Sequence, residues 1–347
     1  MKRWMMAAVI GCGLACACTD DRTGDPVGQQ TVTRRVRIEA AAPGTRTELA
    51  GDGYNVLWSP GDRIGVYVES GGTVTTSNAP LTFEGSAPSS GGTFSGEITL
   101  TEGASSYTLY AYYPYSAESS AEPTNVAFTL SAQQTQTTAG DSSHLGDSDF
   151  LVAGAVTSAT GDFGPLTFSH AFAVVEVDLT GSGTMAGKSV ESVMLFGTDA
   201  ATVSSSGTLS GTANMTGGFT FDLTATSNAS ATYAGGEAQI NYCGVTFAEP
   251  PTLGTQPVKA YLTVNPADYS QGGGVVYVVV STTDGYTSTW SMPGIVISPA
   301  QMPVITQDVS TGVATGPTVS LSSSAETANC YVVSTPSQSY SFDATVA

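Results

Sequence analysis

Histidine and acidic side chains could carry acid–base or metal chemistry here, and the chain has few histidines. Its 347 residues include two, His144 and His170. The run GDSSHLGDSD places His144 among Asp141, Asp147 and Asp149, whose carboxylate oxygens could bind Ca²⁺. The run lacks the glycine and terminal glutamate of a twelve-residue calcium loop, which favours a solvated acidic loop. His170, in FSHAF, alternates like a strand residue at a domain surface. We therefore predict no catalytic, cofactor or metal site, and no enzymatic activity.

The first residues have the pattern of an export signal. Lys2 and Arg3 precede an uncharged, apolar run over residues 4–17. That run has the length of a secretory core and is too short to span a bilayer permanently. We predict a signal peptide over residues 1–17.

Three cysteines lie at the end of this signal, and a thiol there is a candidate for lipid attachment. Cys18 follows the small residues Ala15 and Ala17, which signal peptidases accept. It resembles the acceptor cysteine of a bacterial lipoprotein, and the polar residues 18–35 then form a lipidated tether. Cys16 and Cys12 are rival acceptors, and an ordinary cleaved signal is the alternative. No histidine or further cysteine lies close enough in sequence to complete a tetrahedral metal site.

The two remaining cysteines, Cys243 and Cys330, lie in strand-like apolar sequence. They could form a disulfide in an oxidising compartment. Separate buried thiols are the alternative, because free cysteine is among the most buried residue types.

A tyrosine-rich run could act as a sugar-stacking platform, as lectin surfaces do. It contains Tyr107, Tyr110, Tyr112, Tyr113 and Tyr115. The alternative is that these rings divide between a core and a strand edge, because tyrosine has a large apolar ring with one polar end.

Composition and charge limit the fold and the partners. Glycine, serine and threonine are abundant, strand-forming residues recur in short runs, and no stretch keeps a helical period. This indicates an all-β protein. The formal net charge of −19 repels phosphate backbones, so nucleic acid is not an expected partner.

The strands that must position these groups are predicted from alternation. A hairpin or tight corner at Pro60–Gly61 should bring Trp58 and the following aliphatics to one core. Val175, Val177 and Leu179 should share one strand face. Further strands are expected at 93–100, 106–115, 125–130, 149–156, 166–179, 189–197, 207–212, 218–225, 238–247, 258–265, 273–285 and 287–292. We predict a sandwich over 36–160, a second over 161–315, and extra strands or the start of a truncated module over 316–347.

Five segments resemble the fimbrillin family of Bacteroidota, which forms the subunits and anchors of type V pili. They are TRTEL at 45–49, WSPGDRIGVYV at 58–68, YAYYPYS at 110–116, DFLVAG at 149–154 and LTFSHAFAVVEVDL at 166–179. The set covers roughly residues 36–180. The resemblance implies two tandem transthyretin-like β-sandwiches, export as a lipoprotein through Cys18, and display at the outer membrane or in a fimbrium.

The resemblance also implies a mode of assembly. In polymerising relatives a protease cuts after an arginine, and a strand of another pilus subunit fills the vacated groove. The candidate arginines are Arg34, Arg35, Arg37 and Arg46. The alternative is that they lie on an intact first strand, as in anchor or accessory members. A different function on the same scaffold would be the binding of host glycans or proteins through exposed aromatic rings.

Overall fold

The protein is elongated and consists almost entirely of strands. The computed structural model describes residues 30–43, 57–198, 201–203, 209–212, 214–225, 231–233, 240–270 and 274–314. Within these ranges the helical elements are two short 3₁₀ turns, η1 (Ser143–Ser148) and η2 (Gly183–Met185). No described helix is long and apolar enough to cross a membrane. The predicted all-β class is confirmed.

The N-terminal lobe is one sheet that closes on itself. Its order is β2-β3-β4-β1-β10-β8-β5-β9, and β2 also pairs with β5. The strands are β1 (Thr31–Ala41), β2 (Arg63–Ser70), β3 (Thr73–Phe83), β4 (Gly91–Thr101), β5 (Tyr107–Tyr113), β8 (Leu151–Ala153), β9 (Val156–Ser158) and β10 (Leu166–His170). Pairing of β2 with β5 leaves few open strand edges, and such edges promote unwanted association.

The predicted corner before β2 is confirmed. Gly61 has a φ of +95°, a conformation that glycine adopts without steric cost. The turn places Trp58 in one core with the alternating side chains of Ile64, Val66 and Val68. All four side chains are buried.

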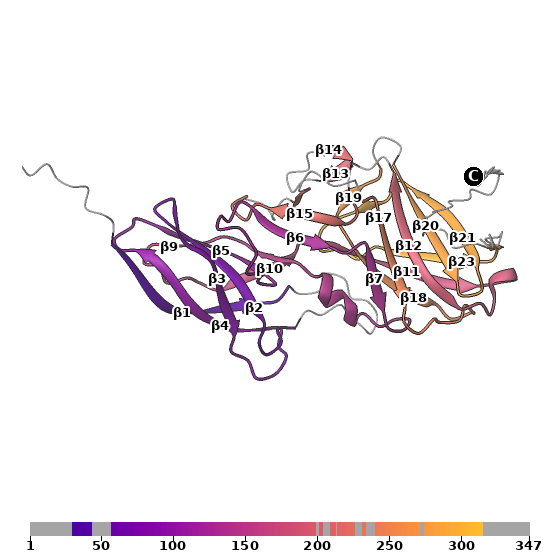
Figure 1. The fold of residues 1–347 in the computed structure, drawn as a ribbon, viewed down its shortest axis with the longest axis horizontal. Coiled ribbons are helices and arrows are strands. Elements are labelled where there is room, and N and C mark those ends of the chain that lie inside the picture. Colours follow the sequence, from indigo (N-terminus) through magenta and orange to yellow (C-terminus); the bar gives the residue numbers. More distant parts are fainter. Residues whose placement is uncertain are drawn as a thin grey trace, which may run out of the picture.

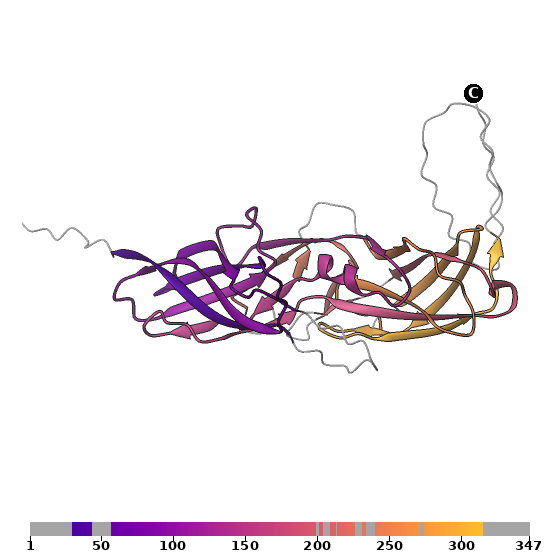
Figure 2. The same cartoon turned by 90° about the horizontal axis from the view of Figure 1, so that it is seen from below.

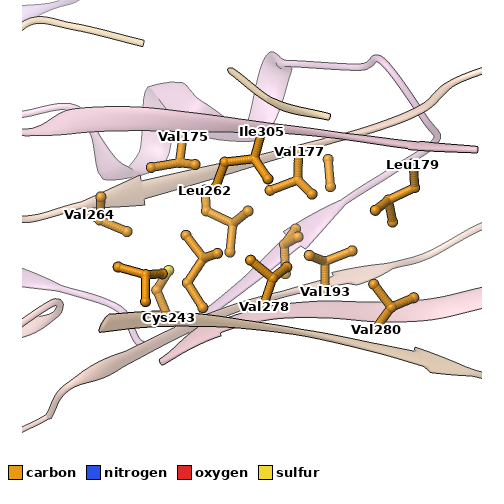
Figure 3. Close-up of a cluster of buried hydrophobic side chains, with 14 of the residues drawn as sticks. Val175, Val177, Leu179, Val193, Cys243, Leu262, Val264, Val278, Val280 and Ile305 are labelled. Atoms are coloured by element: carbon orange, nitrogen blue, oxygen red, sulfur yellow. The ribbon is translucent and has the colours of Figure 1, made fainter. Parts of the chain in front are cut away.

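The C-terminal lobe packs two sheets face to face. The first has the order β18-β11-β23 and the second β24-β21-β20-β12-β17-β7. Their strands are β7 (Gln133–Gln136), β11 (Ala173–Gly181), β12 (Val190–Thr198), β17 (Tyr242–Phe247), β18 (Val258–Val264), β20 (Val275–Thr282), β21 (Tyr286–Pro293), β23 (Val304–Val309) and β24 (Val313–Ala314). Figure 3 shows Val175, Val177 and Leu179 pointing into this core toward Val193 and Val278, as their alternation predicts.

Smaller sheets lie where the lobes meet. One sheet has the order β16-β15-β6 and comprises β6 (Val126–Leu130), β15 (Gly217–Phe221) and β16 (Ala231–Tyr233). The other has the order β14-β13-β19-β22 and comprises β13 (Ala201–Val203), β14 (Leu209–Thr212), β19 (Ala267–Asp268) and β22 (Val296–Ile297). In Figures 1 and 2, β6 and β15 lie midway along the molecule. An aromatic cluster there joins Tyr67 and Phe150 of the N-terminal half to Phe219 and Phe221 of β15.

Strand pairing divides the chain differently from the expected boundary near residue 160. Residues 166–170 form β10, which pairs with β1 and β8 of the first sheet. The single strand expected over 166–179 is two strands in different sheets, separated at Ala171 and Phe172. Conversely, β7 pairs with β17 of the C-terminal lobe, although residues 133–136 precede the expected boundary. Hydrophobic alternation continues across this break, so it does not mark the change of sheet.

Candidate functional site

The first strand occupies an unusual place in the N-terminal sheet. It pairs antiparallel with β4 along its whole length, from Thr31↔Thr101 to Ala41↔Gly91. On its other side it pairs parallel with β10, at Ala40↔Leu166 and Ala41↔Thr167. The C-terminal end of β1 is therefore an interior strand, while its N-terminal part has a strand neighbour on one side within the described residues.

The inner face of β1 contributes to the core of the N-terminal lobe. Ile38 is 2% exposed and Ala40 is 3% exposed. Ile38 lies opposite Phe94 in the ladder, and both belong to the cluster around Trp58. Withdrawal of β1 would uncover this apolar surface, at a cost of about 25 cal/mol for each Å² exposed to water.

Each of the three arginines in β1 contacts a different neighbour. Arg34 Nη2 donates to the carbonyl of Gly161 and lies 3.2 Å from Asp162 Oδ1. Arg35 Nη2 donates to Ser95 Oγ at 3.1 Å. The Arg37 guanidinium forms an ion pair with the Glu84 carboxylate, although the Arg37 side chain is 68% exposed. The sequence does not reveal these partners, which are distant in the chain.

A pocket lies between β1 and the segment that leads into β10. Its volume is about 210 Å³, and its lining comprises residues 34–38 and 161–163. Because Arg34, Arg35 and Arg37 all line it, this pocket brings together three of the four predicted maturation arginines. The fourth, Arg46, lies outside the described residues.

The cysteine predictions fall mostly outside the described part of the chain. Cys12, Cys16, Cys18 and Cys330 all lie there, so lipidation and the disulfide stay predictions. Cys243 is completely buried. Its burial raises the pKa of the thiol, which makes the reactive thiolate scarce at neutral pH.

The tyrosine run does not form an exposed platform. Tyr107, Tyr110 and Tyr112 are buried, and Tyr113 and Tyr115 are partly buried. The Tyr107 hydroxyl donates to the carbonyl of Thr101 at 2.8 Å. Burial, with the Glu69 carboxylate nearby, raises the pKa of Tyr110 to about 12. Tyr107 and Tyr113 pack in one core, and Tyr110 and Tyr112 pack in another.

The histidines have structural partners. His170 Nδ1 lies 2.6 Å from Asp149 Oδ1, which ties the end of β10 to the start of β8. His144 Nε2 lies 3.0 Å from the carbonyl oxygen of Tyr261. The Asp149 carboxylate therefore contacts His170 and does not belong to the acidic loop. Among the described residues, no three His, Cys, Asp or Glu side chains are arranged to hold a metal ion. The register of the β8–β10 ladder would suggest the His170–Asp149 pair, because it places His170 opposite Leu151, two residues after Asp149.

The sequence profile of the fimbrillin-like family matches residues 45–329. The chain belongs to the fimbrillin-like family. The match extends well beyond the segments over 36–180 that carried the resemblance. Fimbrillin-like proteins are structural and non-enzymatic, and membership supports a fimbrial or adhesion-related role at the cell surface, in assembly with other pilus subunits.

Solved structures of low sequence identity are similar over most of the chain. A protein described as a cell adhesion protein, from Bacteroides uniformis, is 17% identical with a TM-score of 0.49, over 80% of this chain and 94% of that one. A similarly described protein from Bacteroides ovatus is 17% identical with a TM-score of 0.49, over 81% and 95%. The C-terminally truncated tip fimbrial protein Mfa3 from Porphyromonas gingivalis is 9% identical with a TM-score of 0.34, over 76% and 81%. No curated protein sequence matches the chain.

Proposed function

We propose that this protein is a subunit, anchor or accessory component of a surface pilus that assembles by β-strand exchange. The observation that carries the proposal is the position of β1. It is the first strand of the described chain, it pairs with β4 along its whole length, and it buries Ile38 and Ala40 in the core. A single cut after β1 would free it from the chain without breaking any other strand connection.

The cut is proposed to fall after Arg46. Arg34, Arg35 and Arg37 lie within the paired length of β1. A protease that binds its substrate as a separate extended segment would first have to unpair β1 from β4. Arg46 follows β1 in sequence, and cleavage there would leave β1 held by hydrogen bonds and packing alone. A donor strand could then replace β1, with main-chain bonds for affinity and alternate side chains for register.

Attachment to the outer membrane is proposed to use Cys18. A lipid there anchors the chain, and loss of β1 by cleavage would release the remaining protein from that anchor. Anchoring and assembly are therefore linked through the same N-terminal segment. Replacing Cys18 by serine should abolish lipid labelling in cells, and retained labelling would move the acceptor to Cys16 or Cys12.

The assembly proposal is tested by cleavage of the purified protein. An arginine-specific protease should remove β1 and give a ladder of SDS-resistant oligomers. Arg46→Ala should prevent both, while an Arg34/Arg35/Arg37→Ala triple variant should still be cut. Arg63→Ala, at the start of β2, is the matched control and should behave like the wild type. Cleaved protein that stays monomeric would refute strand exchange.

The alternative of ligand binding through exposed aromatic rings has less support. It depended on the run from Tyr107 to Tyr115, and Tyr107, Tyr110 and Tyr112 are buried. A glycan-array signal lost on replacing these tyrosines would have to be separated from loss of folding, because their rings lie in two cores.

A further inference from the structure

The two edges of β1 differ in what they contact. One edge is hydrogen-bonded to β4 from Thr31 to Ala41. The other meets β10 at Ala40 and Ala41. Within the described part of the chain, residues 31–39 therefore present one edge with no strand beside it. An open strand edge carries unused main-chain donors and acceptors and is a template for a further strand.

The register identifies which backbone groups face that open edge. Two main-chain bonds continue the β1–β4 ladder beyond its ends. The carbonyl of Gln30 accepts from the Glu102 N–H, and the Ala42 N–H donates to the carbonyl of Ser90. Both are even-numbered, and hydrogen-bonded pairs alternate along an antiparallel ladder. The odd-numbered residues of β1 therefore direct their N–H and C=O groups away from β4. Arg35 and Arg37 are among them.

The pocket lies along this edge. Its walls are residues 34–38 of β1 and residues 161–163, which precede β10. The two segments meet at Ala40 and Leu166 and diverge toward the N-terminal end of β1. Arg34 reaches across the gap to Gly161 and Asp162. The pocket, about 210 Å³, has room for a short stretch of extended chain and not for a whole domain.

The charge of the pocket selects an acidic occupant. Three of the chain's ten basic residues line it, in a protein of net charge −19. Carboxylates pair with Arg34 and Arg37, while the partner that the described residues give Arg35 is a serine hydroxyl. In addition, Arg34 Nε is buried and has no hydrogen-bond acceptor among the described residues. An apolar segment would desolvate these guanidinium groups without compensation, whereas carboxylates form strong charge-assisted bonds with them.

We infer that the open edge of β1 docks a short, extended, acidic segment of a partner polypeptide while β1 remains in place. The segment pairs through its backbone with Arg35 and Arg37, and its Asp or Glu side chains contact the guanidinium groups. This docking requires no proteolysis, so it does not depend on the strand exchange proposed above. It gives the uncleaved protein a means of holding a partner.

The test uses a fluorescent peptide of alternating threonine and glutamate, about six residues long, the usual length of a strand. Its binding to the intact chain is followed by fluorescence anisotropy. Saturable binding is expected, weakening with added salt because exposed charges are screened. Replacing Arg35 and Arg37 together by Gln should weaken it about tenfold, the equivalent of 1.4 kcal/mol. Arg63→Gln, which removes an arginine remote from the pocket lining, is the matched control and should leave binding unchanged.

A second peptide separates strand pairing from simple charge attraction. It has the same sequence with alternate amide nitrogens methylated, which removes the donors a strand edge requires and keeps the charge. We expect it to bind at least about tenfold more weakly. Equal binding of the two peptides would overturn strand pairing, and absence of saturable binding would overturn the inference altogether. Arg46→Ala, which removes the proposed cleavage site, should bind the peptide normally. Peptide binding therefore tests the docking inference separately from the cleavage proposal.

Discussion

The side-chain amide of Gln134 bonds to the backbone of Thr263 as a neighbouring strand would. Gln134 Oε1 accepts from the Thr263 N–H at 3.0 Å, and Nε2 donates to the Thr263 carbonyl at 2.8 Å. Thr263 lies in β18, the edge strand of the three-stranded sheet. Two residues along β7, Gln136 Oε1 accepts from the N–H of Tyr261 and Nε2 donates to the carbonyl of Lys259. The glutamines of β7 thus complete the edge of β18, while the backbone of β7 pairs with β17 in the opposite sheet.

Gln136→Leu is predicted to destabilise the protein strongly. The Gln136 side chain is fully buried, and leucine would remove the acceptor of the Tyr261 N–H, while the carbonyl of Lys259 still accepts from the N–H of Gly140. A buried unsatisfied group costs about 1–3 kcal/mol, so we expect a loss of roughly 2 kcal/mol in the free energy of unfolding. Urea denaturation measures it. Gln133→Leu, three positions earlier and exposed, is the matched control and should change stability by less than about 0.5 kcal/mol. Equal effects of the two substitutions would contradict the edge-completing role.

Elements with hydrophobic alternation were predictable from the sequence, and β7 shows why others were not. β4, β12 and β20 lie close to their expected ranges because their buried side chains recur at every second position. The QQTQ segment of β7 also alternates, in that Gln134 and Gln136 are buried and Gln133 is exposed. Its buried residues are polar, because they bond to a strand edge, and no hydrophobic pattern reveals that.

The same limit applies to the candidate site. The sequence placed the arginines of β1 on a first strand, which is correct for Arg34, Arg35 and Arg37. The pocket depends on Asp162 and Gly161, which follow Arg34 by more than 120 positions. Only the parallel pairing of β1 with β10 brings these segments together, and that pairing has no short-range sequence signal. Glu176 lies on the face of β11 opposite Val175 and Val177, yet it is 1% exposed, because residues of η1 and β18 cover that side of β11.

Lys259→Met is predicted to destabilise the C-terminal lobe. Lys259 Nζ contacts Glu176 Oε1, and Glu176 is buried. Methionine would leave the Glu176 carboxylate without its cation. Removing one partner of a buried ion pair costs about 3–5 kcal/mol of the free energy of unfolding. We expect about 3 kcal/mol here, because the Lys259 side chain is 40% exposed. Urea denaturation should show partial recovery in the Lys259→Met/Glu176→Gln double variant. Lys188→Met is the control and should have a much smaller effect, because the Asp284 carboxylate that it leaves behind is 50% exposed and stays hydrated.

Because of Asp178, the free energy of unfolding is predicted to decrease as pH rises from about 4 to about 6. Burial and the neighbouring Glu176 carboxylate raise the pKa of Asp178 to about 6, against the opposing influence of Lys259. In that window the folded state keeps a proton that the unfolded chain has lost, so unfolding becomes more favourable as pH rises. Asp178→Asn should remove this contribution, and its stability relative to the wild type should increase from pH 4 to pH 7. Asp147→Asn, on the exposed side of η1, is the control. Parallel pH profiles for the wild type and Asp178→Asn would contradict the prediction.

Phe221→Ala is predicted to loosen the junction between the lobes as well as to reduce stability. The Phe221 ring centroid lies 4.4 Å from that of Phe150, just before β8, and 5.8 Å from that of Phe172, between β10 and β11, so it joins β15 to segments of the N-terminal half and of the connection between the lobes. Loss of a buried phenylalanine ring costs about 3–5 kcal/mol. Spin labels on the two lobes should report a broader distance distribution in this variant. Phe83→Ala, within the N-terminal core, should cost comparable stability and leave the distribution narrow. Broadening in both variants would contradict a specific role for the junction.

Removal of β1 is predicted to shift the fluorescence of Trp58 to longer wavelength. Trp58 is buried and packs edge-to-face on Phe94, with ring centroids 5.1 Å apart. Phe94 lies opposite Ile38 of β1, so departure of β1 admits water beside this pair. The measurement uses a Trp290→Phe background, because Trp290 lies in β21 of the other lobe. Cleavage after Arg46 should shift the emission only once β1 dissociates, and a donor strand that fills the groove should reverse it.

The matched control keeps Trp290 and replaces Trp58 by phenylalanine. Its emission should not change on cleavage, because the core around Trp290 does not include β1. Mass spectrometry identifies the samples in which β1 has left. An unchanged Trp58 spectrum in those samples would mean that the lobe closes over the vacated position, and no groove would remain for a donor strand to fill.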